Sequence, residues 1–345
     1  MYLNKKTNNF DLLRLALAIT VAIVHAETLT QLEVFATFSQ FLNSKTAVDS
    51  FFIISGFLIF MSFDSNSRIA DYGIKRARRI IPGYSAVIII CAVFMFFIST
   101  EKVSDYFNIE FIKYIFFNLL TLNFIHHSLP GVFNENPIHD INGALWTIKI
   151  EVMFYFSVPF IVYAFSKSNK ALILISIYIL SVFYSALMFW LSSHYEMEIF
   201  VKLERQLPGQ MTFFISGAFL YYYFDSFYKN YLPILITSLS ILLIHKYIIN
   251  INFLYPAALA VMVIYFATIF KHLGNFGKLG DLSFGVYIWH FPIIQIFISY
   301  DFFSNIILGT LSLTLSIFLI SYLSWHLIEK RFLLTSSHYV TSEKE

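Results

Sequence analysis

The sequence has little charge and almost no cysteine. Charged residues make up 13% of its 345 residues, about half the share of an ordinary soluble domain, which argues against a soluble globular protein. The single cysteine, Cys91, excludes an intrachain disulfide and a thiol-based metal site. The net charge of +2 gives no indication of a nucleic-acid partner. We expect neither a metal nor a bound cofactor.

The sequence is rich instead in apolar and aromatic residues. Hydrophobic residues make up 58% of the chain, and 41 Phe and 22 Tyr are among them. Such residues suit lipid-facing and interfacial positions of membrane helices. The composition predicts an all-α polytopic membrane protein, with one membrane-embedded domain over residues 1–335 and a short polar cytoplasmic tail over 336–345.

Apolar runs recur along the whole sequence. The eleven runs cover roughly 10–29, 47–63, 81–99, 111–125, 145–165, 171–191, 209–225, 231–249, 252–270, 282–299 and 303–325. The run at 111–125 is the shortest, so it either crosses the membrane or forms a re-entrant or interfacial helix. If it does not cross, fifteen Lys and Arg lie inside and six outside; if it crosses, the split is ten to eleven. The positive-inside rule therefore predicts ten spans with both termini in the cytoplasm.

The first run, 10–29, carries ionisable side chains on an otherwise apolar helix. Asp11 and Arg14 lie near one end, and His25 follows eleven residues after Arg14. On a helix this spacing is about 16 Å and brings the two side chains to nearly the same face. Ionisable residues inside a membrane helix indicate a functional site or pathway. Because Arg14 interrupts the run and no small-residue cleavage site follows, we expect a retained span.

Two carboxylates are predicted at the depth of His25, in the outer half of the membrane. Asp49 opens the second run from outside, and Glu151 lies about 8 Å into the run that begins near Trp146. An imidazole between two carboxylates would reduce the cost of placing them in hydrocarbon, and carboxylates also orient a general base. The alternative is that these groups only fasten helices together.

Basic and polar residues also gather at the predicted inner surface. Arg76 and Arg79 precede the third run and share a helix face, which suits a phosphate group. The alternative is a topology anchor that binds anionic lipid. Later in the chain Asp281 predicts a helix N-cap. His290, near mid-membrane, is typical of a packing residue, and Glu329 belongs to a polar edge that faces the cytoplasm.

Six stretches together resemble the acyltransferase family 3 proteins, the bacterial integral-membrane O-acyltransferases that modify surface glycans. The stretches are Phe10-Asp11-x-x-Arg14 with His25, Ala47-Val48-Asp49-x-Phe51-Phe52-x-x-Ser55-Gly56-Phe57-Leu58, Arg76-x-x-Arg79-Ile80-x-Pro82, Leu145-Trp146-Thr147-x-x-x-Glu151-x-x-Phe154-Tyr155, Gly280-Asp281-x-Ser283-x-Gly285-x-Tyr287 with His290, and Ser324 with Glu329. They follow the family's order and cover nearly the whole chain.

The resemblance implies about ten spans in the bacterial inner membrane and an acyl group, most commonly acetyl, supplied by cytoplasmic acyl-CoA. It implies an essential histidine at His25 and an arginine pair at Arg76 and Arg79, which Arg14 would assist in holding the CoA phosphates. The acceptor would be a hydroxyl of a cell-surface or lipid-linked glycan. Some members carry an additional periplasmic hydrolase-like domain, and members without it can need a separate periplasmic partner.

The sequence leaves open both the chemistry of transfer and the class of the protein. The chemistry is either direct transfer, with His25 as general base and Glu151 or Asp49 as its orienting group, or a relay through an acyl-histidine. The protein could also be a transporter or exporter of a glycan or lipid, since intramembrane charge fits that class too. A transporter predicts interrupted helices in two corresponding halves, and the sequence shows no such repeat.

Overall fold

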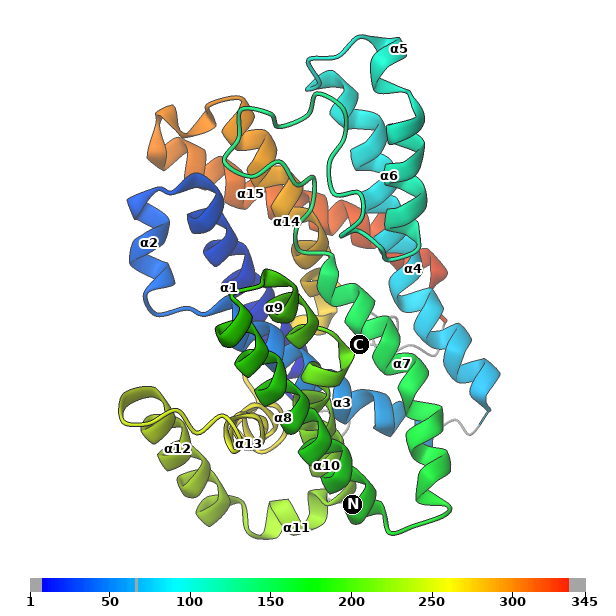
Figure 1. The fold of residues 1–345 in the computed structure, drawn as a ribbon, viewed down its shortest axis with the longest axis vertical. Helices are drawn as coiled ribbons and strands as arrows, with labels where there is room; N and C mark the ends of the chain where they lie inside the picture. The colour runs from blue at the N-terminus through cyan, green and yellow to red at the C-terminus, as the bar shows by residue number, and fades with distance from the viewer. Residues whose placement is uncertain (1–7, 66–67, 335–345) are drawn as a thin grey trace. The chain divides into compact units, whose positions relative to one another are not determined.

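The computed structural model describes residues 8–65 and 68–334. It is helical, with 77% helix and no strand among those residues (Figure 1). Within the described ranges, seven helical segments are long and apolar enough to cross a membrane. They are Phe10–Thr30, Ser44–Asp64, Ile69–Phe97, Trp146–Phe165, Lys170–Tyr195, Leu282–Ser299 and Ile306–Phe332.

The all-α prediction is confirmed, and seven such helices indicate a multi-pass membrane protein. Three shorter helices coincide with further predicted runs: α10 (Leu207–Tyr222), α12 (Tyr231–Tyr247) and α13 (Tyr255–Thr268). The total of ten spans and the side on which the termini lie stay predictions. The polar tail predicted over 336–345 lies outside the described residues.

The chain forms two compact units from interleaved segments. The first unit comprises Met1–Leu13, Val48–Gly73 and Ile150–Gly274. The second unit comprises Arg14–Ala47, Ile74–Lys149 and Asn275–Glu345. The helices of the first unit are most of α3 (Ser44–Asp64) and α7 (Trp146–Phe165), then α8 (Lys170–Tyr195), α9 (Glu198–Glu204), α10, α11 (Phe224–Lys229), α12 and α13.

Close backbone contact between α3 and α10 marks the core of the first unit. A Cβ atom at Gly56 would lie 1.9 Å from the carbonyl oxygen of Phe214, and one at Gly217 would lie 2.0 Å from that of Ile53. Only glycine permits this approach, as is common where helices pack in membranes. The ring of Phe154 from α7 stacks on Phe214 with centroids 4.1 Å apart, so α7 joins the same core.

The second unit holds most of the polar contacts described below. Its helices are most of α1 (Phe10–Thr30), α2 (Glu33–Ser39), most of α4 (Ile69–Phe94), α5 (Val103–Tyr106), α6 (Ile109–Leu119), α14 (Leu282–Ser299), α15 (Ile306–Ser324) and α16 (Lys330–Phe332). A π-helical turn, Trp325–Glu329, joins α15 to α16. In α14, Gly285 allows α15 to approach closely, because a Cβ there would lie 2.9 Å from the Cα of Ser321.

Two helices differ from their predicted bounds. We expected the basic residues to precede a span beginning near residue 81, but α4 begins at Ile69 and carries Arg76 and Arg79 within it. The run predicted over 111–125 forms α6, which ends at Leu119, and the chain turns at Thr121 with φ of 61°. Eleven residues of helix are about 16 Å long, so α6 alone is too short to cross a bilayer.

α6 lies alongside α4 in the second unit (Figure 1). The hydroxyl of Tyr84 on α4 donates to the carbonyl oxygen of Asn118 at 2.7 Å. The hydroxyl of Tyr106 on α5 donates to the carbonyl oxygen of Ala92 at 2.6 Å. Both tyrosines are buried, so these hydrogen bonds satisfy polar groups that would otherwise be costly in an apolar setting.

Candidate functional site

His25 on α1 pairs with His290 on α14. Nδ1 of His25 lies 2.8 Å from Nε2 of His290, and the two rings stack with centroids 5.1 Å apart. His290 is fully buried, whereas His25 is half-buried. We expected His290 to lie deeper than His25 as a packing residue. That interpretation was wrong, because the two imidazoles, 265 residues apart in the sequence, form one hydrogen-bonded pair.

The loop between α6 and α7 fixes the part of α14 that carries His290. The side-chain amide of Asn142 donates to the carbonyl oxygen of Ile288 at 2.8 Å. One residue later, Gly143 leaves room for the ring of Phe291, since a Cβ would lie 2.9 Å from that ring. The same loop segment therefore contacts α14 on both sides of His290, at Ile288 and at Phe291.

Two further contacts extend this support along α14. The hydroxyl of Tyr287, one of the predicted site residues, lies 2.7 Å from the hydroxyl of Thr147, and both residues are buried. Thr147 directly follows Trp146, the half-buried first residue of α7. Near the other end of α14, the buried amide of Gln295 donates to the carbonyl oxygens of Ile138 and Asp140 at 2.6 and 2.8 Å. Hydrogen bonds thus join α14 to the loop and to the start of α7 at several points along the helix.

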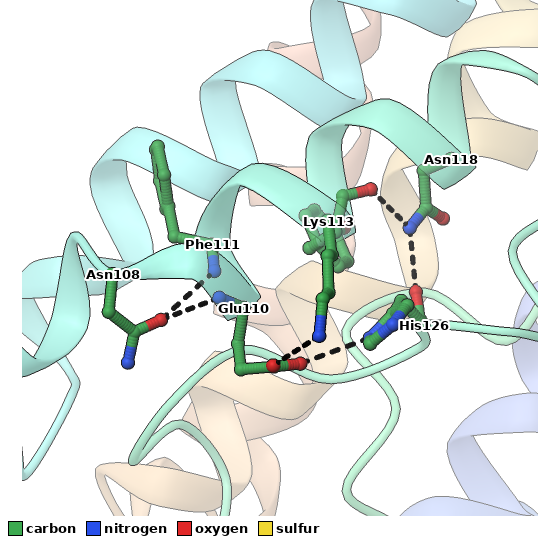
Figure 2. A network of polar contacts seen from close by, with 7 residues as sticks. Asn108, Glu110, Phe111, Lys113, Asn118 and His126 are labelled. Atoms are coloured by element: carbon green, nitrogen blue, oxygen red, sulfur yellow. Dashed lines mark hydrogen bonds and ion pairs between the residues drawn. The ribbon is translucent and has the colours of Figure 1, made fainter.

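Figure 2 shows the polar contacts within α6 and between α6 and the beginning of the loop. Oδ1 of Asn108 accepts a hydrogen bond from the backbone N–H of Glu110 and caps α6. Glu110 accepts from Lys113 Nζ at 2.7 Å and lies 3.6 Å from Nδ1 of His126. The hydrogen bond from Lys113 is the main reason that the pKa of Glu110 falls below its ordinary value. The amide of Asn118 holds the carbonyl oxygen of His126 at 2.7 Å.

A second polar cluster surrounds the start of α14. Asp281 forms an ion pair with the guanidinium of Arg79, and its other carboxylate oxygen accepts from the backbone N–H of Ser283. The predicted N-cap is thus confirmed, and the same carboxylate binds Arg79. The guanidinium also lies 5.5 Å from the ring centroid of Phe284, within the range of a cation–π contact.

Glu329 belongs to this cluster as well. Its Oε1 accepts a hydrogen bond from the hydroxyl of Ser324 at 2.8 Å. The positive charge of Arg79 interacts electrostatically with the carboxyl group of Glu329. Glu329 is 2% exposed and packs against Gly83, where a Cβ would lie 3.1 Å from its Cγ. The π-helical turn inserts one residue into the helical repeat and directs Glu329 toward α4; such turns often occur at functional sites. The sequence predicted Glu329 at a polar edge that faces the cytoplasm; the residue is instead buried, and the side of the membrane on which it lies stays a prediction.

The remaining basic candidates lie on α4 and α1. Arg76 is half-buried and precedes Arg79 by one turn on the same face of α4, while Arg78 between them is exposed. Asp11 and Arg14 are half-buried in the first turns of α1. Because α1 is one continuous helix, Arg14 lies about 16 Å along the axis from the histidine pair.

The predicted carboxylates belong to the first unit. Asp49 on α3 is 2% exposed, and Ser55 lies half-buried on the same helix. Glu151 on α7 accepts a hydrogen bond from the hydroxyl of Tyr155 at 2.5 Å. His25 belongs to the second unit, so the grouping of His25 with Asp49 and Glu151 stays a prediction.

Sequence reasoning identified the residues but missed their partners. His290 and Asp281 appeared in the motifs, yet nothing local in the sequence indicates that they bind His25 and Arg79. Lys149, two residues before Glu151, places its Nζ 4.7 Å from the ring centroid of Phe124. The available signal was chemical: each buried ionisable group needs a partner, and both Asp281 and His290 stand beside glycine or aromatic residues typical of close packing.

Comparison with known proteins shows the family of the chain. An O-acetyl transferase of Shigella phage Sf6 is 28% identical over 340 residues, which covers 96% of this chain and 98% of that protein. Nodulation protein 10 of Rhizobium leguminosarum bv. viciae is 27% identical over 179 residues, 48% of this chain and 46% of that protein. No solved structure matches. A family model described as an acyltransferase domain matches residues 7–326, and the chain therefore belongs to this membrane acyltransferase family, as its six sequence stretches indicated.

Proposed function

We propose that the protein is an O-acetyltransferase of the bacterial inner membrane. It takes the acetyl group from cytoplasmic acetyl-CoA and transfers it to a hydroxyl of a cell-surface or lipid-linked glycan at the outer face. Membership of the acyltransferase family and the similarity to a phage O-acetyl transferase support this class of reaction. The observation that carries the proposal is the half-buried imidazole of His25, held at one nitrogen by His290.

His25 acts as the general base in this proposal. In the part of the chain that the structure describes, the only hydrogen bond of His25 is the one through Nδ1, so Nε2 is the nitrogen available to a substrate. Nε2 takes the proton of the acceptor hydroxyl as its oxygen attacks the thioester carbonyl. The C–S bond breaks, the C–O ester bond forms, and the proton passes to the thiolate of CoA.

The donor is bound through its phosphates by the basic residues of the second unit. Arg76 and Arg79 lie on one face of α4, and Arg14 contributes a third cation from α1. Guanidinium groups bind phosphate oxygens through charge-assisted hydrogen bonds. The ion pair with Asp281 holds Arg79 in one orientation, so Arg79 is organised before the donor arrives. Because Arg14 lies about 16 Å from His25 on α1, an extended donor could reach from the basic residues to the base.

Asp49 and Glu151 are retained as proposed catalytic residues. Both are acidic residues in apolar helices, where a charge is retained mainly for function. An acyl-histidine relay is the alternative chemistry, in which Nε2 of His25 attacks the thioester itself. That relay predicts radiolabelled protein after incubation with labelled acetyl-CoA and no acceptor, whereas direct transfer predicts none. The proposal includes a separate periplasmic partner, because family members without the additional periplasmic domain can need one.

The proposal is tested on the surface glycans of the organism. We expect deletion of the gene to remove a set of O-acetyl signals from the NMR spectrum of the isolated glycan. The wild-type gene should restore these signals, and His25→Ala should not. His245→Ala is the matched control, because His245 accepts a hydrogen bond from the N–H of Ile251 in the first unit. Unchanged acyl substituents in the deletion strain would contradict the proposed function.

A further inference from the structure

The hydrogen bonds of His290 determine where its proton lies. Nδ1 of His290 is 3.0 Å from the carbonyl oxygen of Val286. A carbonyl oxygen only accepts, so Nδ1 of His290 must carry a hydrogen. Whether Nε2 of His290 also carries one depends on the charge of the ring.

The surroundings of His290 favour the neutral ring. Its exposed fraction is 0%, and its ring neighbours are Tyr287, Phe291 and His25. Among the described residues, no carboxylate forms a hydrogen bond or ion pair with it. A buried charge without a partner is strongly disfavoured. With one hydrogen already on Nδ1, the neutral ring has a lone pair on Nε2.

The hydrogen in the 2.8 Å contact must therefore come from His25. Because Nε2 of His290 accepts, Nδ1 of His25 donates. We propose that His290 is a positioning residue that holds neutral His25 in the Nδ1–H tautomer and leaves the lone pair on Nε2. The tautomer assignment depends only on the contacts above; its role in catalysis rests on the proposed function.

The arrangement also has a consequence for the transfer step. When Nε2 of His25 accepts the hydroxyl proton, the Nδ1–H becomes a charge-assisted donor to the lone pair of His290. Charge-assisted hydrogen bonds are about twice as strong as neutral ones, so the contact strengthens as the transition state forms. A catalytic interaction lowers the barrier only if it strengthens in this way. Here a neutral imidazole takes the orienting position that sequence analysis had assigned to a carboxylate.

The position of His290 is fixed well enough for this role. The loop binds the carbonyl oxygen of Ile288 through Asn142. The ring of Phe291 packs edge-to-face against His25, with the two ring centroids 5.6 Å apart. Because Ile288 and Phe291 are both held, the turn of α14 that carries His290 cannot move without breaking these contacts.

The direct test is the tautomer of His25 in the full-length protein. Histidine labelled with an NMR-active nitrogen isotope is incorporated, the protein is placed in lipid nanodiscs, and the signals of His25 are assigned by their absence in His25→Gln. We expect a proton on Nδ1 and none on Nε2. A proton on Nε2 of His25 in the wild-type protein would overturn the inference.

Two variants of His290 extend the test. Gln can place an amide oxygen near the position of Nε2, whereas Leu removes the acceptor. We expect His290→Gln to retain the Nδ1–H tautomer of His25 and His290→Leu to lose it. If Leu prevents folding, the Gln variant still decides, because a change of tautomer in folded His290→Gln contradicts an acceptor role for residue 290.

Kinetics separate positioning from a merely structural role. Membranes of the deletion strain supply the acceptor, and transfer of radiolabelled acetyl-CoA is measured. We expect His290→Leu to lower kcat at least tenfold, because it removes part of the 10²–10⁴-fold rate increase that a general base supplies. The KM for acetyl-CoA should not change. His290→Gln should recover most of kcat, and His245→Leu should match wild type. Equal losses in Gln and Leu, or a loss confined to KM, would contradict positioning.

The outcomes distinguish this inference from the proposed function. If the tautomer is as expected but no acetyl transfer depends on His25, the histidine pair stands and the proposed function fails. If transfer depends on His25 but its proton lies on Nε2, the function stands and the inference about His290 fails.

Discussion

Replacing Asp281 tests the polar cluster at the start of α14. Its carboxylate is 4% exposed and the paired Arg79 is 19% exposed. One oxygen binds the guanidinium, and the other caps α14 through the N–H and hydroxyl of Ser283. Asp281→Ala removes both interactions, whereas Asp281→Asn keeps an oxygen for the cap and removes the charge.

The two interactions give the expected magnitudes. Removing one partner of a buried ion pair costs about 3–5 kcal/mol, and the partial exposure of Arg79 favours the lower end, about 3 kcal/mol. Loss of an N-cap adds about 1 kcal/mol. We therefore expect Asp281→Ala to lower the free energy of unfolding by about 4 kcal/mol. Asp281→Asn keeps the cap and should lower it by about 3 kcal/mol.

The assay is denaturant unfolding of the purified protein in mixed detergent micelles. The double variant with Arg79→Leu and Asp281→Ala should lose less than the sum of the single variants, with a coupling of roughly 0.5–3 kcal/mol. Arg78→Ala, at an exposed position on the same helix, should change stability by no more than about 0.5 kcal/mol. Strict additivity of the two changes would show that Arg79 and Asp281 do not interact and would refute the reasoning.

Three further predictions follow from the same contacts. Arg76→Ala should weaken acetyl-CoA binding by roughly 1.5–3 kcal/mol, the value of a charge-assisted hydrogen bond, while Arg78→Ala binds normally; equal affinity in a calorimetric titration would favour the lipid-anchor interpretation. Gln295→Leu should cost roughly 2–4 kcal/mol of stability, because it leaves the loop carbonyls unpaired, and should speed proteolysis of the loop; unchanged proteolysis contradicts this. Reporter fusions after Lys170 and Lys278 should both report a cytoplasmic location; an external signal from either rules out ten spans.

Local patterns predicted most of the helices but not all of their ends. The run at 282–299 coincides with α14, and Asp281 caps it as its side chain indicated. The apolar pattern failed at α4, because charged residues were excluded from the run. Ala, Lys and Arg are good helix formers, so the helix continues back through the basic residues to Ile69. Hydropathy predicts which residues lie in the membrane, whereas helix propensity predicts where the helix itself begins and ends.

The site was predicted in its residues and missed in its pairings. His25 and His290 are 265 residues apart in sequence, and Arg79 and Asp281 are 202 apart. Periodicity and capping rules act over a few residues, so they cannot indicate contacts at such separations. Depth along a helix was the one long-range argument available, and it placed His290 too deep. Its estimate depended on where each span meets the membrane surface, which apolar runs define only to within a turn.

The most direct test of the account is acetyl transfer by the His25→Gln protein. Wild-type protein in proteoliposomes is given radiolabelled acetyl-CoA together with acceptor glycolipids from the deletion strain, and label in the glycan is measured. We predict that His25→Gln lowers the rate by 10²–10⁴-fold, the usual contribution of a general base, while binding acetyl-CoA with wild-type affinity, and that His245→Gln transfers normally. A rate in His25→Gln within tenfold of wild type would contradict the central claim that His25 is the base for acetyl transfer.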